Sequence, residues 1–223
     1  MRYPPGHRQE SRSRILHAAA ELFRRNGIAA TGVDRVMARA GFTAGGFYGH
    51  FASKDGLVAA AVDAAAVESS QRWYGRFDEL RGRAWATALV ETYLSTEHRD
   101  DRSGGCILPS LGGEIARSGG PARLRFERRL RGLFDFAALR SQGELPAERE
   151  EFVAAIALCV GGLLLSRAVK TPALSREILA AARAGALRLL GVERSRAPSR
   201  RARPAPRTRK SKASARPSTR NTP

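Results

Sequence analysis

Four polar residues between positions 31 and 54 have the chemistry to bind phosphate oxygens. Tyr48 and His50 can donate hydrogen bonds, and Lys54 adds a positive charge. Thr31 precedes a predicted helix, whose free N-terminal amide groups attract anions. The four histidines are scattered and the two cysteines form no metal-ligand set, so we expect no catalytic residues, no metal and no cofactor.

Short helices separated by glycine must position these residues. Apolar residues on one face predict a first helix over residues 11–26, which Gly27 ends. The same spacing predicts a second helix over residues 33–40, which Gly41 ends. We expect Thr43 to cap a third helix and Ser53 to cap a fourth. Three aromatic side chains should anchor the third helix in the core: Phe42, Phe47 and Phe51.

The second and third helices, joined by a tight turn, form a candidate helix-turn-helix. Packing of the second helix on the first would hold the third as a short rod with an outward face of small residues. Small residues let a helix approach base edges closely in the major groove of DNA. The outward residues are Thr43, Ala44, Gly45, Gly46, Tyr48 and His50. From the spacing alone, a helical hairpin that merely packs is the alternative.

The complete residue string favours the DNA-binding helix-turn-helix over a hairpin that merely packs. Residues 31–62 read TGVDRVMARAGFTAGGFYGHFASKDGLVAAAV, and residues 11–36 read SRSRILHAAAELFRRNGIAATGVDRV. A helix ending in Ala40-Gly41 precedes an aromatic-Tyr-x-His-Phe string and then Ser53-Lys54. This pattern, over roughly residues 11–62, strongly resembles the DNA-binding region of the tetracycline-repressor (TetR) family.

The resemblance assigns DNA contacts to individual positions. It implies phosphate contacts at Thr31, Tyr48, His50 and Lys54, and base contacts at Thr43, Ala44, Gly45 and Gly46. Many relatives carry Lys or Arg in place of Ala44, and Thr or Ser in place of Gly46. Because both residues are small here, we expect bases to be read by Thr43, by backbone and methyl groups, and by Arg35 or Arg39 reaching in.

The helical pattern continues beyond residue 80, and strand-like alternation is not found. We expect helices over residues 83–98, 106–117, 121–140, 147–169 and 175–190, with a turn at 143–146. The predicted fold is all-α, with an N-terminal three-helix helix-turn-helix domain and a C-terminal helical domain for ligand binding and dimerisation. The predicted divisions are a flexible arm (1–10), the DNA-binding domain (11–56, motif about 33–52), the C-terminal domain (57–193) and a disordered Arg-rich tail (194–223).

Apolar stripes on the last two predicted helices favour a homodimer, with an internal core as the alternative. One stripe comprises Phe152, Ile156, Val160 and Leu163, and a second, Val153, Ala157, Val160 and Leu164, widens it. The last helix carries Ile178, Ala182, Gly185 and Leu189. A two-fold dimer predicts a palindromic operator.

A small-molecule pocket is expected among the middle helices, although plain core packing would explain the same residues. The candidates are Trp85, Leu89, Tyr93, Cys106, Leu108, Leu111, Phe126, Leu130 and Phe134. Cys106 follows two glycines at the predicted start of a short helix, where a thiol can have a lowered pKa and sense electrophiles. A small apolar residue that fits its site is the alternative for Cys106.

The charge of the chain and its targeting signals bear on its binding partner and its cellular location. The net charge is +18, and the segment from Arg194 to Pro223 holds eleven Lys and Arg residues and no Asp or Glu. Such a chain attracts nucleic acid, although GC-rich coding also enriches arginine. With two cysteines, no recognisable signal peptide and a longest apolar run (152–165) too short to span a bilayer, we expect a cytoplasmic protein without a membrane partner.

Three functions are compatible with these features. The first is a regulator, in particular a repressor, that an unidentified small-molecule effector releases from a double-stranded DNA operator. The second is a weakly specific DNA-coating protein that uses the Arg-rich tail. The third is a ligand-binding or enzymatic helical bundle, which the residues of the third helix disfavour.

Overall fold

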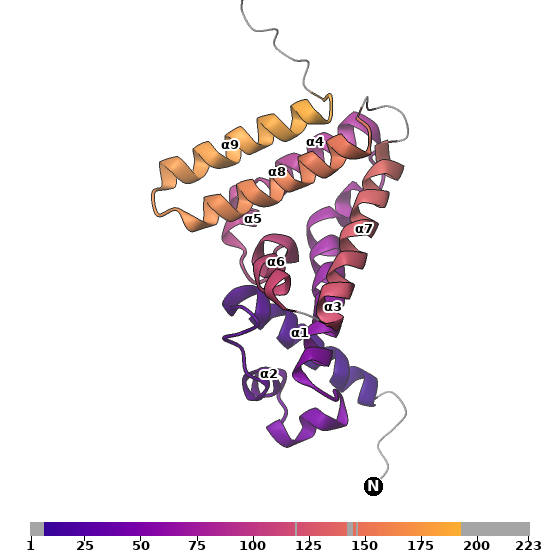
Figure 1. Cartoon of the computed structure of the whole chain (residues 1–223), viewed down its shortest axis with the longest axis vertical. Coiled ribbons are helices and arrows are strands. Elements are labelled where there is room, and N and C mark those ends of the chain that lie inside the picture. Colours follow the sequence, from indigo (N-terminus) through magenta and orange to yellow (C-terminus); the bar gives the residue numbers. More distant parts are fainter. Residues whose placement is uncertain (1–6, 119, 142–144, 146, 193–223) are drawn as a thin grey trace, which may run out of the picture.

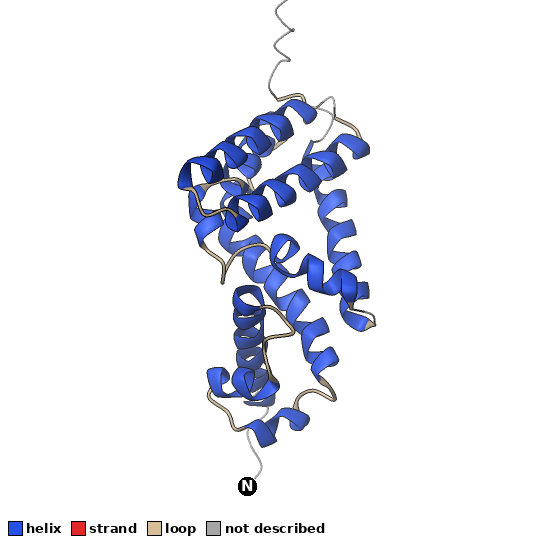
Figure 2. Ribbon diagram, turned by 60° about the vertical axis from the view of Figure 1, so that its left-hand side comes forward, coloured by secondary structure: helices blue, strands red, loops and turns tan. Residues whose placement is uncertain are grey.

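Helices provide all the regular secondary structure that the computed structural model describes, over residues 7–118, 120–141, 145 and 147–192 (Figure 2). The prediction of an all-α fold is therefore confirmed. In chain order the elements are α1 (His7–Asn26), α2 (Val33–Ala40), the 3₁₀ helix η1 (Ala44–Gly49), α3 (Lys54–Tyr74), the 3₁₀ helix η2 (Gly75–Phe77), α4 (Gly82–Tyr93), α5 (Thr96–Asp100), α6 (Ile107–Arg117), α7 (Pro121–Ser141), α8 (Arg149–Ala168) and α9 (Pro172–Leu189).

Several helix boundaries differ from the prediction; α9, for example, begins at Pro172 rather than at residue 175. α1 begins at His7, so the expected flexible arm is wrong for residues 7–10, and residues 1–6 lie outside the described part. The helix expected over 83–98 is broken after Tyr93, and Ser95 starts α5 by accepting a hydrogen bond from the amide of His98 at 3.1 Å. Most of the expected turn at 143–146 and the whole tail from 194 lie outside the described residues.

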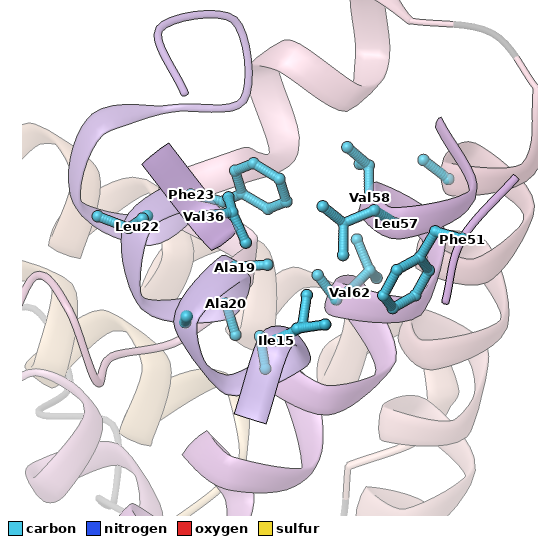
Figure 3. Packing of buried hydrophobic residues seen from close by; sticks show 14 of the residues in the cluster. Ile15, Ala19, Ala20, Leu22, Phe23, Val36, Phe51, Leu57, Val58 and Val62 are labelled. Atoms are coloured by element: carbon cyan, nitrogen blue, oxygen red, sulfur yellow. The ribbon is translucent and has the colours of Figure 1, made fainter. Parts of the chain in front are cut away.

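A first hydrophobic core joins the N-terminal helices to α6. Ile15 and Phe23 of α1 pack with Val36 of α2 and with Leu57 and Val62 of α3 (Figure 3). Three residues of α6 complete this core: Ile107, Leu111 and Ile115. α3 also runs unbroken through the domain boundary expected at residues 56–57. The helices around the predicted helix-turn-helix therefore share their core with the following part of the chain.

A second core lies at the other end of the molecule, where α8 and α9 run side by side (Figure 1). A Cβ added at Gly162 would collide with the Cβ of Ala182, so only glycine permits this close approach. Three residues expected at a dimer interface are consequently buried inside the subunit: Phe152, Leu163 and Ala182. For these three the expectation is wrong, because their face of the stripe packs on α4 and on the neighbouring helix of the same chain.

The opposite side of α8 and α9 is apolar and exposed. Ile156, Val160, Ile178 and Gly185 are half-buried, and Leu189 is exposed. The exposed large apolar residues on these two helices are Val153, Leu158, Leu164, Leu165, Leu174 and Leu189. α8 also has the length and apolar composition of a membrane span, a test that core helices of globular proteins pass as well.

A fully buried histidine joins α4 to the start of α6. Nδ1 of His98 lies 2.8 Å from the carbonyl oxygen of Tyr93, and Nε2 lies 3.0 Å from the amide nitrogen of Cys106. Since a carbonyl must accept and an amide must donate, the proton is on Nδ1 and the ring is neutral. Burial is the main reason that the pKa of His98 falls to about 4; the hydrogen bond to Tyr93 opposes this shift.

This pKa predicts a pH-dependent stability. Below pH 6.5 the unfolded chain takes up a proton at His98, whereas the folded chain does so only near pH 4. The stabilisation from neutral His98 is therefore present above pH 6.5 and is lost as the pH falls from 6.5 to 4, by about 3 kcal/mol in total. Urea unfolding of the wild type and His98→Gln from pH 7 to 4 should give a free-energy difference that shrinks towards pH 4. A difference that stays constant would contradict this assignment.

Candidate nucleic-acid interface

The predicted third helix is a 3₁₀ helix, η1, that follows a tight turn. Gly41 ends α2 in the left-handed conformation, at φ 79°, and Thr43 precedes η1 with an extended backbone. Thr43 makes no side-chain capping bond, so its expected capping role is wrong. Three of the six residues of η1 are glycine, which disfavours the α-helix, and such a short segment gains few α-helical hydrogen bonds.

Two aromatic side chains hold this segment on the protein. Phe47 and Phe51 are 2% and 5% exposed, and their rings stack with centroids 5.8 Å apart. On the outside, Thr43, Ala44, Gly45 and Gly46 are all exposed, and Tyr48 is 79% exposed. The structure thus brings the predicted base-reading residues together on one solvent-facing strip.

Three arginines of α1 also hold the turn and η1, and no sequence pattern marks them for this role. Arg8 donates to the carbonyl of Gly49 at 2.9 Å, and Arg12 donates to that of His50 at 2.6 Å. The guanidinium of Arg12 also lies 4.2 Å from the centre of the Phe51 ring. Arg14 donates to the carbonyl of Ala40 at 2.8 Å and lies 4.7 Å from the ring centre of Phe42. Only the spacing of basic residues along α1 could have hinted at this arrangement.

Thr31 does not present its hydroxyl group for a phosphate. The residue is fully buried, and the hydroxyl donates to the carbonyl of Gly27 at 2.7 Å, which closes the loop between α1 and α2. α2 begins at Val33, as predicted, and Gly32 precedes it without a side-chain capping bond. The Thr31 hydroxyl is therefore already bonded within the protein, and a phosphate contact at this position stays a prediction for the amide groups at the start of α2.

His50 and Lys54 are half-buried beside this strip. Burial, followed by the charges of Arg8 and Arg12 and by His7, lowers the pKa of His50. At neutral pH the imidazole is therefore uncharged, and any phosphate contact would use a neutral N–H donor. Lys54 is the first residue of α3, directly after the capping residue Ser53, which accepts a hydrogen bond from Gly56 at 3.1 Å.

The two α2 arginines differ in placement. Arg35 is exposed in the first half of α2, whereas Arg39 pairs with Glu21 of α1 at 2.7 Å. Arg39 lines an open groove of about 870 Å³ between α1, α2, α3 and α7. Of the two, Arg35 is therefore the better candidate for a base or backbone contact.

The predicted ligand-pocket residues are mostly packed into the cores. Trp85, Tyr93 and Cys106 belong to the second core and Leu111 to the first. The others are half-buried: Leu89, Leu108, Phe126, Leu130 and Phe134. None of the nine lines the groove beside Arg39 or a second hollow, of about 540 Å³, between α1, α3 and residues 103–104. The pocket therefore stays a prediction.

Cys106 lacks the environment expected of a reactive thiol. It is buried, and burial raises the pKa of the thiol, with the neighbouring Tyr93 acting in the opposite direction. The expected lowering of the pKa by the helix N-terminus is therefore wrong, because loss of solvent outweighs the helix dipole at this position. Cys159 is likewise buried, and burial raises its pKa to about 12.

Comparison with known proteins identifies this arrangement. Residues 15–61, which contain α2, η1 and parts of α1 and α3, match the model of the tetR family of bacterial regulatory proteins. This N-terminal region therefore has the TetR-family type of DNA-binding domain. The HTH-type transcriptional regulator UidR of Escherichia coli K12 is 31% identical over 91 residues, which are 40% of this chain and 44% of that protein. The HTH-type transcriptional repressor Rv3405c of Mycobacterium tuberculosis is 32% identical over 97 residues, covering 40% and 52%.

The TetR-family likeness extends to the whole fold among solved structures. The reduced form of E. coli NemR superimposes with a TM-score of 0.68 at 19% identity, covering 82% of this chain and 98% of NemR. A TetR transcriptional regulator from Chloroflexus aurantiacus gives a TM-score of 0.66 at 23% identity, covering 79% and 94%. At these identities the likeness concerns the fold alone, and in sequence the chain matches only about half the length of UidR and Rv3405c.

The exposure of Tyr48 predicts a phenotype for a minimal change. In Tyr48→Phe only a solvent-facing hydroxyl is lost, so the thermal unfolding midpoint should stay unchanged. If the hydroxyl donates to a phosphate, affinity should fall roughly 5-fold, corresponding to about 1 kcal/mol, and equally on every DNA duplex. Fluorescence anisotropy with two unrelated duplexes measures this loss. Unchanged affinity on both would remove Tyr48 from the interface.

Proposed function

We propose that this chain is a cytoplasmic, homodimeric transcription regulator of the TetR family, a repressor that a small-molecule effector releases from a palindromic operator. The observation that carries the proposal is the exposed strip from Thr43 to Gly46, fixed from behind by buried Phe47 and Phe51. A segment that has small outward residues and is held rigidly from behind fits the requirements of a major-groove reader.

In this proposal, base and phosphate contacts come from different groups. Thr43 and the methyl group of Ala44 read base edges together with the backbone of Gly45 and Gly46, and Arg35 reaches in from α2. Tyr48, His50 and Lys54 bind phosphates at the margin of the strip. Because few side chains can form hydrogen bonds with bases, sequence preference would depend strongly on DNA shape and on the exact placement of η1.

The exposed apolar side of α8 and α9 supports a homodimer. Val153, Ala157 and Leu164 are exposed and Val160 is half-buried, on one side of α8. Exposed leucines of α9, such as Leu174 and Leu189, extend the apolar surface. Burying such a surface against a second copy would form a four-helix interface within residues 57–193, leaving residues 11–56 to bind DNA.

α6 offers a route by which an effector could act on the DNA-binding end. Its Glu114 accepts hydrogen bonds from the amides of Ile28 and Ala29, at 3.0 and 2.8 Å, in the loop that follows α1. Gly27 has a φ of 88°, which favours glycine, and a Cβ there would lie 2.5 Å from the same carboxylate. Buried Arg24 of α1 also donates to the carbonyl of Ser103, ahead of α6. Movement of α6 would therefore displace α1 directly.

The test begins with DNA sequences selected from a random duplex library by the full chain. We expect a palindrome whose half-sites lie about 34–36 Å apart or somewhat more, and a dimer in analytical ultracentrifugation. In gel shifts, a duplex with both half-sites should bind at least roughly 100-fold more tightly than a duplex with one. Equal affinity for the two duplexes would contradict the dimeric regulator, and failure to select any sequence would favour the weakly specific DNA-coating alternative.

A further inference from the structure

We propose that Arg12, assisted by Arg8 and Arg14, is a positioning residue that determines how well this protein discriminates between DNA sequences. This inference rests on the proposed function and deepens it. The three arginines fasten the turn and η1 to α1 through backbone carbonyls, so they set the position of the strip that faces the bases.

The reading segment, Thr43 to His50, makes few contacts that would hold its own backbone in place. η1 is a single short 3₁₀ stretch with Gly45, Gly46 and Gly49, and a Cβ added at Gly45 or Gly49 would meet no atom within 4 Å. Glycine without side-chain contacts leaves the backbone free to take other conformations. Phe47 fixes the middle of the segment, but its C-terminal carbonyls need separate partners.

Arg8 and Arg12 supply those partners from one face of α1, one helical turn apart. They bind the consecutive carbonyls of Gly49 and His50, and Arg12 has the shorter contact, 2.6 Å. Stacking on Phe51, whose ring belongs to the first core, fixes the direction of the Arg12 guanidinium. A planar guanidinium can form such a bond and stack at the same time, whereas a lysine ammonium offers no planar fork.

Arg14 performs the same task at the N-terminal end of the turn, on the far side of η1 from Gly49 and His50. It binds the carbonyl of Ala40, the last residue of α2, and lies over Phe42. Its terminal nitrogen would be 2.8 Å from a Cβ at Gly41, so the left-handed turn and the arginine fit together. The segment that runs from the end of α2 to the end of η1 is therefore bound to α1 at both of its ends.

The position of η1 matters more for discrimination between DNA sequences than for the general affinity for DNA. Ala44, Gly45 and Gly46 have no side-chain donors or acceptors, so they distinguish bases only through close backbone and methyl contacts, which a small displacement would abolish. Attraction between basic side chains and phosphates acts over a longer range and tolerates such a displacement. Loss of Arg12 should therefore weaken binding to the preferred sequence far more than binding to other DNA.

The experiment compares Arg12→Gln, Arg12→Lys and the charge-matched control Arg25→Gln, whose arginine is exposed near the opposite end of α1. Each full-length variant is titrated with a duplex selected by the wild-type chain and with a shuffled duplex, at several salt concentrations. We expect the affinity ratio between the duplexes to fall at least 10-fold in Arg12→Gln, to remain depressed in Arg12→Lys, and to stay at the wild-type value in Arg25→Gln.

A direct phosphate contact would give a different result. Arg12→Gln would then weaken both duplexes equally, would lower the salt dependence by about one phosphate contact, and Arg12→Lys would restore both affinities. That outcome would overturn the positioning role. If Arg12→Gln is unfolded by circular dichroism, Arg8→Gln replaces it, with a smaller fall in the ratio expected and an unchanged ratio overturning the inference. Failure of the wild-type chain to select any duplex would instead refute the proposed function.

Discussion

Burial of Phe47 and Phe51 is the interaction on which the DNA-facing end of this protein depends. The segment between Thr43 and His50 is short, rich in glycine and exposed, and cannot hold a conformation by its own hydrogen bonds. The two rings tie it to the first core, in which Ile15 and Phe23 of α1 meet α2 and α3. α1 thus supports η1 twice, through this apolar contact and through arginines that bind its carbonyls.

The same helix connects the DNA-facing end to the rest of the fold. Glu114 of α6 binds the loop that ends α1, and Arg24 binds the segment that leads into α6. That segment is fixed in turn by His98 and by Arg167 of α8, which donates to the carbonyls of His98 and Arg99 at 2.6 and 2.9 Å. A continuous series of side-chain-to-backbone bonds therefore runs from α8 to α1, in place of a flexible linker between two separate bodies.

The sequence predicted the elements well and their detailed contacts poorly. Apolar spacing and the stops at Gly27 and Gly41 located the first two helices, because these signals are local. Spacing alone could not decide which side of α8 packs inwards, since Phe152 and Val153 both belong to apolar stripes and only the approach of α9 at Gly162 selects one. The contacts of Thr31, Arg12 and Glu114 were missed, because bonds from side chains to distant carbonyls and amides leave no periodic signal.

Hydrogen–deuterium exchange of the full chain, free and bound to a selected duplex, tests most directly whether the reading segment is preformed. The amides of His50 and Phe51, which bond to the carbonyl of Phe47 at 2.9 and 3.0 Å, should be protected already in the free protein. DNA should add protection between Thr43 and Tyr48 and leave the exchange of the amides in α8 unchanged. Full exchange of His50 and Phe51 in the free chain, with protection appearing only on DNA, would contradict the account.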